Sequence, residues 1–302
     1  MFKSRKTIIF GKNGFLGTHL HQNYQNEEGF YFASRCKNNK LIITSKNHPI
    51  KELPWNHEAL SKIVYELSPQ VVINAIALTN AELCEKSPMN AEQANSEIPL
   101  VLAIASSKVG ARLIQISTDA VFGQKGSFFR EVDEPHPKSV YGRTKLQGEL
   151  AVMKYAPKHL IVRTNFFGYH ESRPTLFNFF YQNLQNQRPV EGYEDVIFNP
   201  IYVKDLVRGL ERFIEVEAQG ILHFAGDEVL SKFDFGNRIE LQVNPTGGLL
   251  SSSVFGDLGI EGYRKSDLTL SSEIRESLFN CSFDVNSGIR DAILDVKADE
   301  NE

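Results

Sequence analysis

Tyr141 and Lys145 are the two residues whose types and spacing most directly indicate catalysis. They stand four residues apart in a segment predicted to be helical, 140–155, so their side chains share one face of that helix. A lysine ammonium beside a phenol favours the phenolate and would lower the tyrosine pKa from about 10 toward the working pH. The pair therefore predicts a general acid that protonates a carbonyl oxygen as hydride arrives.

Thr118 supplies a second hydroxyl group, 23 residues before Tyr141 and directly after the predicted strand Leu113 to Ser117. Proteins of the α/β class place their sites at the carboxyl ends of strands. A hydroxyl at such a position can hydrogen-bond the same carbonyl oxygen and help to polarise it. The glycine turn at 11–17, the Tyr141–Lys145 pair and a hydroxyl at the end of this strand thus point to the same chemistry.

Gly11, Gly14 and Gly17 follow an apolar run, 7–10, and open an amphipathic helix predicted for 15–24. Residues without side chains allow a tight turn, close approach of a pyrophosphate and close packing of helix on sheet. The helix N-terminus then offers N–H donors and the positive end of its dipole to the phosphates. The turn predicts a dinucleotide site; the alternative is a strand-to-helix turn that binds no ligand.

Arg35 lies 24 residues after Gly11, at the end of the second predicted strand, and no acidic residue occurs between Gly29 and Lys51. A carboxylate at this place binds the free ribose hydroxyl of NAD, whereas a cation accommodates the 2′-phosphate of NADP. The sequence therefore favours NADP(H), with NAD(H) as the alternative cofactor. In the other interpretation Arg35 and Lys37 are ordinary solvated loop cations.

The elements that must position these residues alternate between short β-branched runs and longer amphipathic segments. This pattern predicts an α/β fold: a Rossmann-type, doubly wound parallel sheet with a smaller C-terminal substrate-binding lobe. We expect the dinucleotide-binding domain at 1–165, with later segments returning to it, the lobe mainly at 166–296 and a disordered tail at 297–302. Predicted strands are 7–10, 30–34, 71–75, 113–117 and 160–164, with one more within 41–53; predicted helices are 15–24, 58–66, 91–107, 140–155, 176–185, 206–215 and 233–241, and 244–259 is expected to be a flexible loop.

Composition narrows the classes of partner. The 302 residues carry 33 Lys and Arg against 37 Asp and Glu, a net charge of -4, which offers no bulk attraction to nucleic acid or anionic membranes. There is no secretory signal and no apolar run of bilayer length, and three cysteines without a CxxC pattern specify no disulfide framework. We therefore expect a cytoplasmic protein without a metal site, since no HExxH or Cys/His cluster occurs.

Taken together, the motifs resemble those of the extended short-chain dehydrogenase/reductase family, in the branch that contains dTDP-4-dehydrorhamnose reductase. The resemblance covers roughly residues 5 to 240 and rests on the segments 11–17, 74–77, 117–122, 140–149, 163–164, 199–206 and 220–226.

The resemblance implies a role for each matching residue. Tyr141 would be the acid, Lys145 would lower its pKa and grip the nicotinamide ribose, and Thr118 would orient the substrate carbonyl. The implied cofactor-binding residues are Gly11, Asn13, Gly14, Phe15, Leu16, Gly17, Ser34, Arg35, Asn74, Ala75, Ala77, Ser117, Tyr141, Lys145 and Arg163. The implied substrate-binding residues are Thr79, Thr118, Asp119, Asn165 and Arg264.

The activity implied is NADPH-dependent reduction of the 4-keto group of a nucleotide-activated deoxysugar, with a dTDP-sugar favoured and a homodimer as one assembly that such a chain could form. Dehydration is disfavoured, because related dehydratases carry Thr-Asp-Glu where this chain has Ala120 after Asp119. The chain also has Arg264-Lys265 where the reductases usually carry Arg-Pro. Two alternatives remain: a nucleotide-sugar epimerase that retains NAD, and a non-catalytic regulatory or binding subunit with the same fold.

Overall fold

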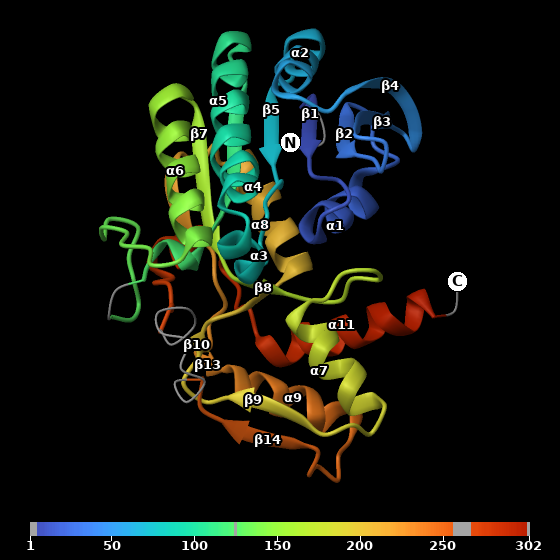
Figure 1. Ribbon diagram of the computed structural model, residues 1–302, viewed down its shortest axis with the longest axis vertical. Coiled ribbons are helices and arrows are strands. Elements are labelled where there is room, and N and C mark those ends of the chain that lie inside the picture. Colours follow the sequence, from blue (N-terminus) through green and yellow to red (C-terminus); the bar gives the residue numbers. More distant parts are fainter. Residues whose placement is uncertain (1–4, 124–125, 256–266, 301–302) are drawn as a thin grey trace. The chain divides into compact units, whose positions relative to one another are not determined.

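The computed structural model describes residues 5–123, 126–255 and 267–300 (Figure 1). The chain divides into two compact units. The first comprises Met1–Val121, Ser139–Arg163 and Val207–Leu222, and the second comprises Phe122–Lys138, Thr164–Leu206 and His223–Glu302. Residues 207–222 thus return to the first unit after the chain has entered the second.

An eight-stranded sheet forms the centre of the first unit, in the order β12-β7-β6-β5-β1-β2-β3-β4. Strand β1 pairs in parallel with β2 and β5, and β5 pairs in parallel with β6. The predicted Rossmann-type parallel sheet is therefore confirmed. The strands are β1 (Thr7–Phe10), β2 (Phe30–Arg35), β3 (Lys40–Ser45), β4 (His48–Pro54), β5 (Val71–Asn74), β6 (Arg112–Thr118), β7 (His159–Thr164) and β12 (Gly220–His223).

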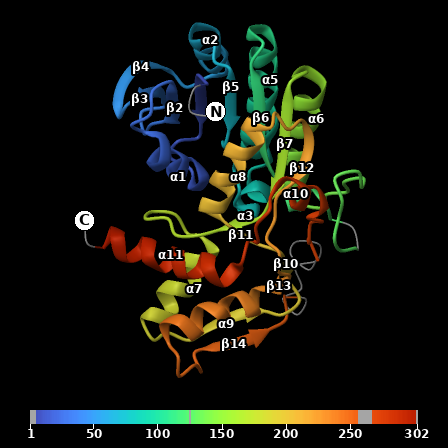
Figure 2. The same cartoon turned by 180° about the vertical axis from the view of Figure 1, so that it is seen from behind.

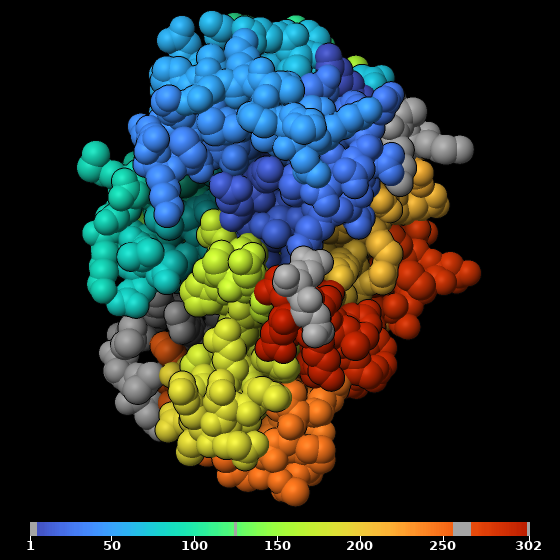
Figure 3. Space-filling model, turned by 90° about the vertical axis from the view of Figure 1, so that its right-hand side faces the viewer, coloured from blue at the N-terminus to red at the C-terminus, as the bar shows by residue number. Residues whose placement is uncertain are grey.

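One edge of this sheet differs from the prediction. Instead of a single parallel strand within 41–53, β3 runs antiparallel to β2, and β4 runs antiparallel to β3. The turn between them contains Lys46 and Asn47 with φ of 46° and 62°, as a tight two-residue hairpin requires. Figure 3 shows the N-terminal part of the chain, in blue, forming an outer surface of this unit.

Helices cover both faces of the sheet, which makes it doubly wound (Figures 1 and 2). Helices α2 (His57–Leu67), α5 (Ile98–Val109) and α6 (Val140–Tyr155) lie on one face, and α1 (Phe15–Tyr24) and α8 (Val203–Glu215) lie on the other. Strand residues such as Ile8, Val72 and Leu113 pack with Ile63 of α2 and Leu102 of α5 in the core. The predicted helix at 91–107 is divided: α4 (Pro88–Glu92) leads through one π-helical segment, η2 (Gln93–Glu97), into α5.

The strand order reverses between β1 and β5, because the chain goes from β1 outward to β2 and later returns to place β5 on the other side of β1. At such a point the loops after two neighbouring strands diverge and leave a crevice at their carboxyl ends. The loop after β1 holds the glycine turn, and the loop after β5 runs to α3 (Ala81–Lys86). The sheet topology therefore puts the expected cofactor residues at its switch point.

The second unit contains short strand pairs and four helices within its described part. Its segment 244–259, expected to be a flexible loop, includes β14 (Leu250–Ser253), which pairs in parallel with β9 (Val190–Tyr193). Of the expected disordered tail, 297–302, residues 297–299 belong to α11 (Val285–Asp299), and residues 301–302 lie outside the described ones. The remaining elements are β8 (Phe166–Phe167), α7 (Leu176–Gln185), β10 (Ile197–Phe198), β11 (Ile201–Tyr202), β13 (Leu230–Ser231), α9 (Lys232–Val243) and α10 (Glu273–Leu278).

Neither unit, in the ranges that the structure describes, has a helix with the length and apolar character needed to cross a bilayer.

Candidate functional site

The glycine turn is tightly constrained by backbone contacts. Gly11 has φ of +96°, and a Cβ there would lie 2.8 Å from the carbonyl carbon of Ala75 in the loop after β5. A Cβ on Gly17 would overlap the carbonyl oxygen of Gly11, because the first turn of α1 packs directly on the turn. The amide of Gly14, the N-cap residue, donates to Gly11 O at 2.8 Å. The turn therefore presents backbone at the start of a helix, with no side chain capping that helix.

The other residues expected to bind the cofactor near this turn differ in burial and in their hydrogen bonds. Asn74 is fully buried; its side chain donates to Gln115 Oε1 at 2.8 Å and accepts from the amide of Ile76 at 3.1 Å, so it shapes the loop that carries Ala75 and Ala77. On α1, Leu16 is buried in the core, whereas Phe15 is half-buried and Asn13 is exposed. Because the side chain of Leu16 is buried in the core, only its backbone remains at the start of the helix.

Arg35 stands exposed at the end of β2, and Ser34 beside it is buried. The Arg35 guanidinium carbon lies 5.6 Å from the centroid of the Trp55 ring, a cation–π contact. Trp55 follows β4, and its amide donates to Asn39 O at 3.0 Å in the turn after Arg35. Trp55 could not be recognised from the sequence, because its contact with Arg35 depends on the β3–β4 hairpin.

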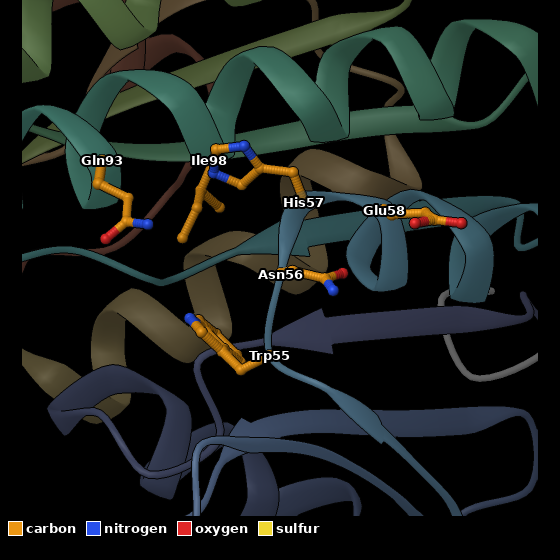
Figure 4. A pocket seen from close by; sticks show the side chains of 6 residues that line it. All are labelled: Trp55, Asn56, His57, Glu58, Gln93 and Ile98. Atoms are coloured by element: carbon orange, nitrogen blue, oxygen red, sulfur yellow. The ribbon is translucent and has the colours of Figure 1, made fainter.

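Trp55 also borders a cavity of about 390 Å³ on the face of the sheet covered by α2 and α5. In Figure 4 the indole of Trp55 lies on one side of this cavity, and Gln93 and Ile98 lie on the other. Asn56, His57 and Glu58 complete the lining, and the Asn56 side chain caps α2 by accepting from the amide of Ala59 at 2.8 Å. Both apolar and polar side chains thus line the cavity, and one of them, Asn56, also caps α2.

Strand β6 and helix α6 bring the predicted catalytic residues together. The ammonium of Lys145 donates to the carbonyl oxygen of Ile116 at 2.7 Å. The hydroxyl of Thr118 acts on the phenol of Tyr141, whose pKa it lowers. Thr118 Oγ1 also donates to Asp119 Oδ1 at 2.9 Å and accepts from the amide of Ala120 at 3.1 Å. Thr118, Tyr141 and Lys145 therefore lie around the carboxyl end of β6, and their catalytic roles stay a prediction.

The electrostatics of the pair differ from the expectation. Burial raises the pKa of Tyr141 well above its usual value; the charges of Asp119 and Cys84 add to this rise, and the Thr118 hydrogen bond opposes it. Burial lowers the pKa of Lys145 to about 8, and the charge of Glu149 opposes that shift. Among the protein's own groups, desolvation outweighs the attraction that was expected to lower the tyrosine pKa.

Asn95 is a buried residue that sequence reasoning missed. It lies in the π-helical segment η2, where its Oδ1 accepts from the amide of Leu78 at 2.9 Å. Its Nδ2 donates to Leu78 O at 3.0 Å and to Thr144 Oγ1 at 3.1 Å. Thr144 in turn donates to the carbonyl of Tyr141 at 3.0 Å. Asn95 therefore ties the loop after β5 to the helix turn that carries Tyr141.

Ser117 and Arg163 occupy other places than the resemblance implies. Both side chains bind the carboxylate of Glu149, and Arg163 Nη2 lies 2.7 Å from Glu149 Oε2. The side chains of Arg163 and Glu149 are only 2% and 0% exposed. Their assignment as side-chain contacts to the cofactor is corrected, because a guanidinium buried to this degree and bound to a carboxylate belongs to the interior.

The residues expected to bind substrate are dispersed. Thr79 is exposed in the loop after β5, and Asp119 is buried in the short helix η3 (Asp119–Val121). Asn165 belongs to the second unit, where its carbonyl accepts from the amide of Ile201 at 2.9 Å. Arg264 lies outside the described residues.

The doubly wound sheet, the glycine turn at its switch point and the Thr118–Tyr141–Lys145 set define an extended short-chain dehydrogenase/reductase. Residues 5–252 match the family model described as the RmlD substrate binding domain, and the chain belongs to this family.

Known relatives agree with this assignment. The dTDP-4-dehydrorhamnose reductase of Mycobacterium tuberculosis is 30% identical over 237 residues, which cover 76% of this chain and 73% of the relative. Methionine adenosyltransferase 2 subunit beta of Bos taurus is 27% identical over 241 residues, which cover 76% of this chain and 70% of that protein. A crystal structure of dTDP-4-dehydrorhamnose reductase from Bacillus anthracis in complex with NADP has a TM-score of 0.82 at 24% identity, covering 96% of this chain and 99% of the other.

Proposed function

We propose that this protein reduces the 4-keto group of a nucleotide-activated deoxysugar with NADPH. The observation that carries the proposal is the union of Tyr141, Thr118 and Lys145 at the carboxyl end of β6, beside the switch point that holds the glycine turn. The similarity to dTDP-4-dehydrorhamnose reductases supports the same reaction, with a dTDP-sugar as substrate.

The chain's residues fit a dinucleotide. A Cβ on Gly11 or Gly17 would collide with backbone atoms of Ala75 or Gly11, so the glycines let the turn pack closely against the loop after β5 and the first turn of α1. The start of α1 offers backbone donors for phosphate. We propose that the adenine enters the cavity beside Trp55 and that Arg35 meets the 2′-phosphate of the adenosine ribose. The relative from Bacillus anthracis, which is described in complex with NADP, supports this choice of cofactor.

Tyr141 would hold the transferred proton at its Oη. The phenol is protonated in the neutral range and would give this proton to the carbonyl oxygen, and a cation that lowers the pKa of Tyr141, as Lys145 would, makes the transfer easier. The hydroxyl of Thr118, which acts on the same phenol, would orient the carbonyl oxygen. Hydride delivery to the carbonyl carbon is the chemistry that bound NADPH supplies.

Lys145 would bind the nicotinamide ribose through its ammonium, which Ile116 O holds in place. We further propose that the second unit supplies contacts to the sugar nucleotide, Asn165 among them. The free thiols of Cys36, Cys84 and Cys281 fit the reducing cytoplasm expected from the sequence. Light scattering on the purified protein would test the expected homodimer.

The decisive experiment follows NADPH absorbance with dTDP-4-dehydrorhamnose as substrate, next to UDP- and GDP-linked 4-keto sugars. We expect stoichiometric NADPH consumption with the dTDP-sugar, and its loss in Tyr141→Phe while NADPH binding is retained. Turnover by Tyr141→Phe at the native rate would refute the assignment. Stoichiometric consumption would also exclude an epimerase, which returns its cofactor to the starting state in each cycle.

A non-catalytic subunit is the second candidate, and the likeness to methionine adenosyltransferase 2 subunit beta supports it. A cofactor bound to the folded protein raises its melting temperature according to affinity and concentration. Absence of turnover on every sugar nucleotide, together with a rise of melting temperature in NADPH, would favour this candidate. An unchanged melting temperature at saturating NADPH would count against both.

A further inference from the structure

Glu149 is the most deeply buried carboxylate near the proposed catalytic set, and no role has yet been assigned to it. Its side chain is 0% exposed. Oε1 accepts hydrogen bonds from Ser117 Oγ and from Arg163 Nε, and Oε2 lies 2.7 Å from Arg163 Nη2. An ionised carboxylate in such a place is expensive to desolvate and persists only where donors saturate it, as they do here.

Glu149 stands one helical turn beyond Lys145 on α6, on the side of the helix that packs against β6. Three consecutive residues of β6 each act on one residue of this face. Ile116 accepts from Lys145, Ser117 donates to Glu149, and Thr118 acts on the pKa of Tyr141. Two hydrogen bonds therefore join the strand to this helix face, and the one made by Glu149 is buried.

The charge of Glu149 acts on Lys145. Burial of the ammonium lowers the pKa of Lys145 to about 8, and the nearby Glu149 carboxylate opposes that shift. Cys84 of α3 and Asp119 of η3 act on Tyr141, and Glu85 of α3 accepts from the amide of Val140. The other titratable groups on elements packed against α6 are Glu82, Lys86, Glu92, Glu97, Lys108 and Arg112.

We propose that Glu149 is a positioning residue that keeps Lys145 charged and seated against β6, without itself touching cofactor or substrate. Ser117 and Arg163 serve this role by holding the carboxylate in place through a hydrogen bond and an ion pair. The proposal rests on the function suggested above for Lys145, because only a charged Lys145 can bind the nicotinamide ribose as an ammonium donor.

The test begins with a readout that needs no catalysis. Urea unfolding of the wild type and of Lys145→Met, measured from pH 6 to 10, gives the ionisation midpoint of Lys145 in the folded protein from the difference between the two curves. We expect the midpoint to fall by about one pH unit when the Glu149 charge is removed.

Glu149→Gln alone leaves Arg163 buried without its partner, which can prevent folding. The double variant Glu149→Gln with Arg163→Met removes both charges at similar volume and is therefore the main test. Its Lys145 midpoint is obtained by comparing its unfolding curve with that of the same double variant carrying Lys145→Met. Glu149→Asp, with Arg163 intact, is the matched variant that retains the carboxylate, and it should keep the midpoint near that of the wild type. Arg163→Met alone retains the Glu149 carboxylate, and a midpoint in the double variant no lower than that of Arg163→Met would overturn the proposal.

A second readout separates a charge effect from loose packing. If the Lys145 midpoint falls by one unit from about 8, the KM for NADPH at pH 8.5 should rise about eightfold in the double variant and stay near the wild-type value at pH 6.5. An increase that is equal at both pH values would contradict the proposal. If the wild type turns over no sugar nucleotide, the reductase assignment fails. The unfolding midpoints still decide the role of Glu149 in that case, because they need no catalysis.

Discussion

The ammonium of Lys145 donates a 2.7 Å hydrogen bond to the carbonyl oxygen of Ile116, the residue two places before Thr118 on β6. Burial there lowers the pKa of Lys145 from 10.5 to about 8. Between these values the folded protein binds fewer protons than the unfolded chain, so the free energy of unfolding should rise with pH, by about 3 kcal/mol across the window. Urea unfolding at pH 7 and pH 10 should show this rise for the wild type but not for Lys145→Met.

Thr118 should act through its hydroxyl group alone. In Thr118→Val the hydroxyl that acts on the phenol of Tyr141 is lost, and the substrate carbonyl loses a donor, so we expect kcat to fall by about 100-fold. Thr118→Ser retains the hydroxyl and should recover most of the rate. The comparison is made by steady-state kinetics with NADPH in excess; equal rates for the valine and serine variants would contradict the role of the hydroxyl.

Most of the first unit could be predicted from local pattern. The helices 15–24 and 140–155 have the observed bounds, because Gly14 and Ser139 stand at their starts. The strand 7–10 also has the observed bounds, because it is a short apolar run that ends at Gly11. The β3–β4 hairpin could not be predicted in this way, since β4 contains Pro49 and Pro54 and has few buried residues. The prolines are tolerated because β4 is the edge strand, where a missing N–H donor has no partner to lose.

The positions of the catalytic set could likewise be predicted from local pattern. The pKa values of these residues could not be predicted. Spacing alone brings Tyr141 and Lys145 to one helix face. The pKa of each depends on burial and on Asp119, Cys84 and Glu149, which reach the site through tertiary packing. Asn95 was missed because helical periodicity does not reveal the π-helical segment that turns its side chain toward Leu78 and Thr144.

Asn95→Ala should weaken both the fold and the site. The variant leaves the amide and carbonyl of Leu78 without their partner, which costs about 2–4 kcal/mol of unfolding free energy. We also expect a lower kcat, because the loop after β5 and the Tyr141 turn of α6 lose their common anchor. Asn95→Asp keeps the acceptor for the Leu78 amide. Its free energy of unfolding in urea should lie between those of the wild type and Asn95→Ala. An alanine variant as stable as the wild type would show that water replaces the amide.

Arg35 should decide between the two nicotinamide cofactors. In Arg35→Ser the proposed partner of the 2′-phosphate is removed, so we expect NADPH to bind about 10- to 100-fold more weakly and NADH to bind nearly as before. Isothermal titration with each cofactor measures both. Trp55→Ala, which removes the ring against Arg35 and one side of the cavity, should weaken NADPH and NADH alike. Equal losses for both cofactors in Arg35→Ser would remove Arg35 from the phosphate site.

Gly17→Ala tests the glycine turn by a single methyl group. A Cβ at residue 17 overlaps the carbonyl oxygen of Gly11, and since that atom is backbone the turn itself must shift. We expect NADPH binding to be lost and the free energy of unfolding to fall by about 1–3 kcal/mol. Gly110→Ala is the matched control: its φ of +71° strains an alanine, but its Cβ meets no atom within 4 Å. The control should lose about 1 kcal/mol and bind NADPH normally, because backbone strain alone is felt there. If both variants bind NADPH equally well, the close packing of α1 on the turn is not what shapes the phosphate site.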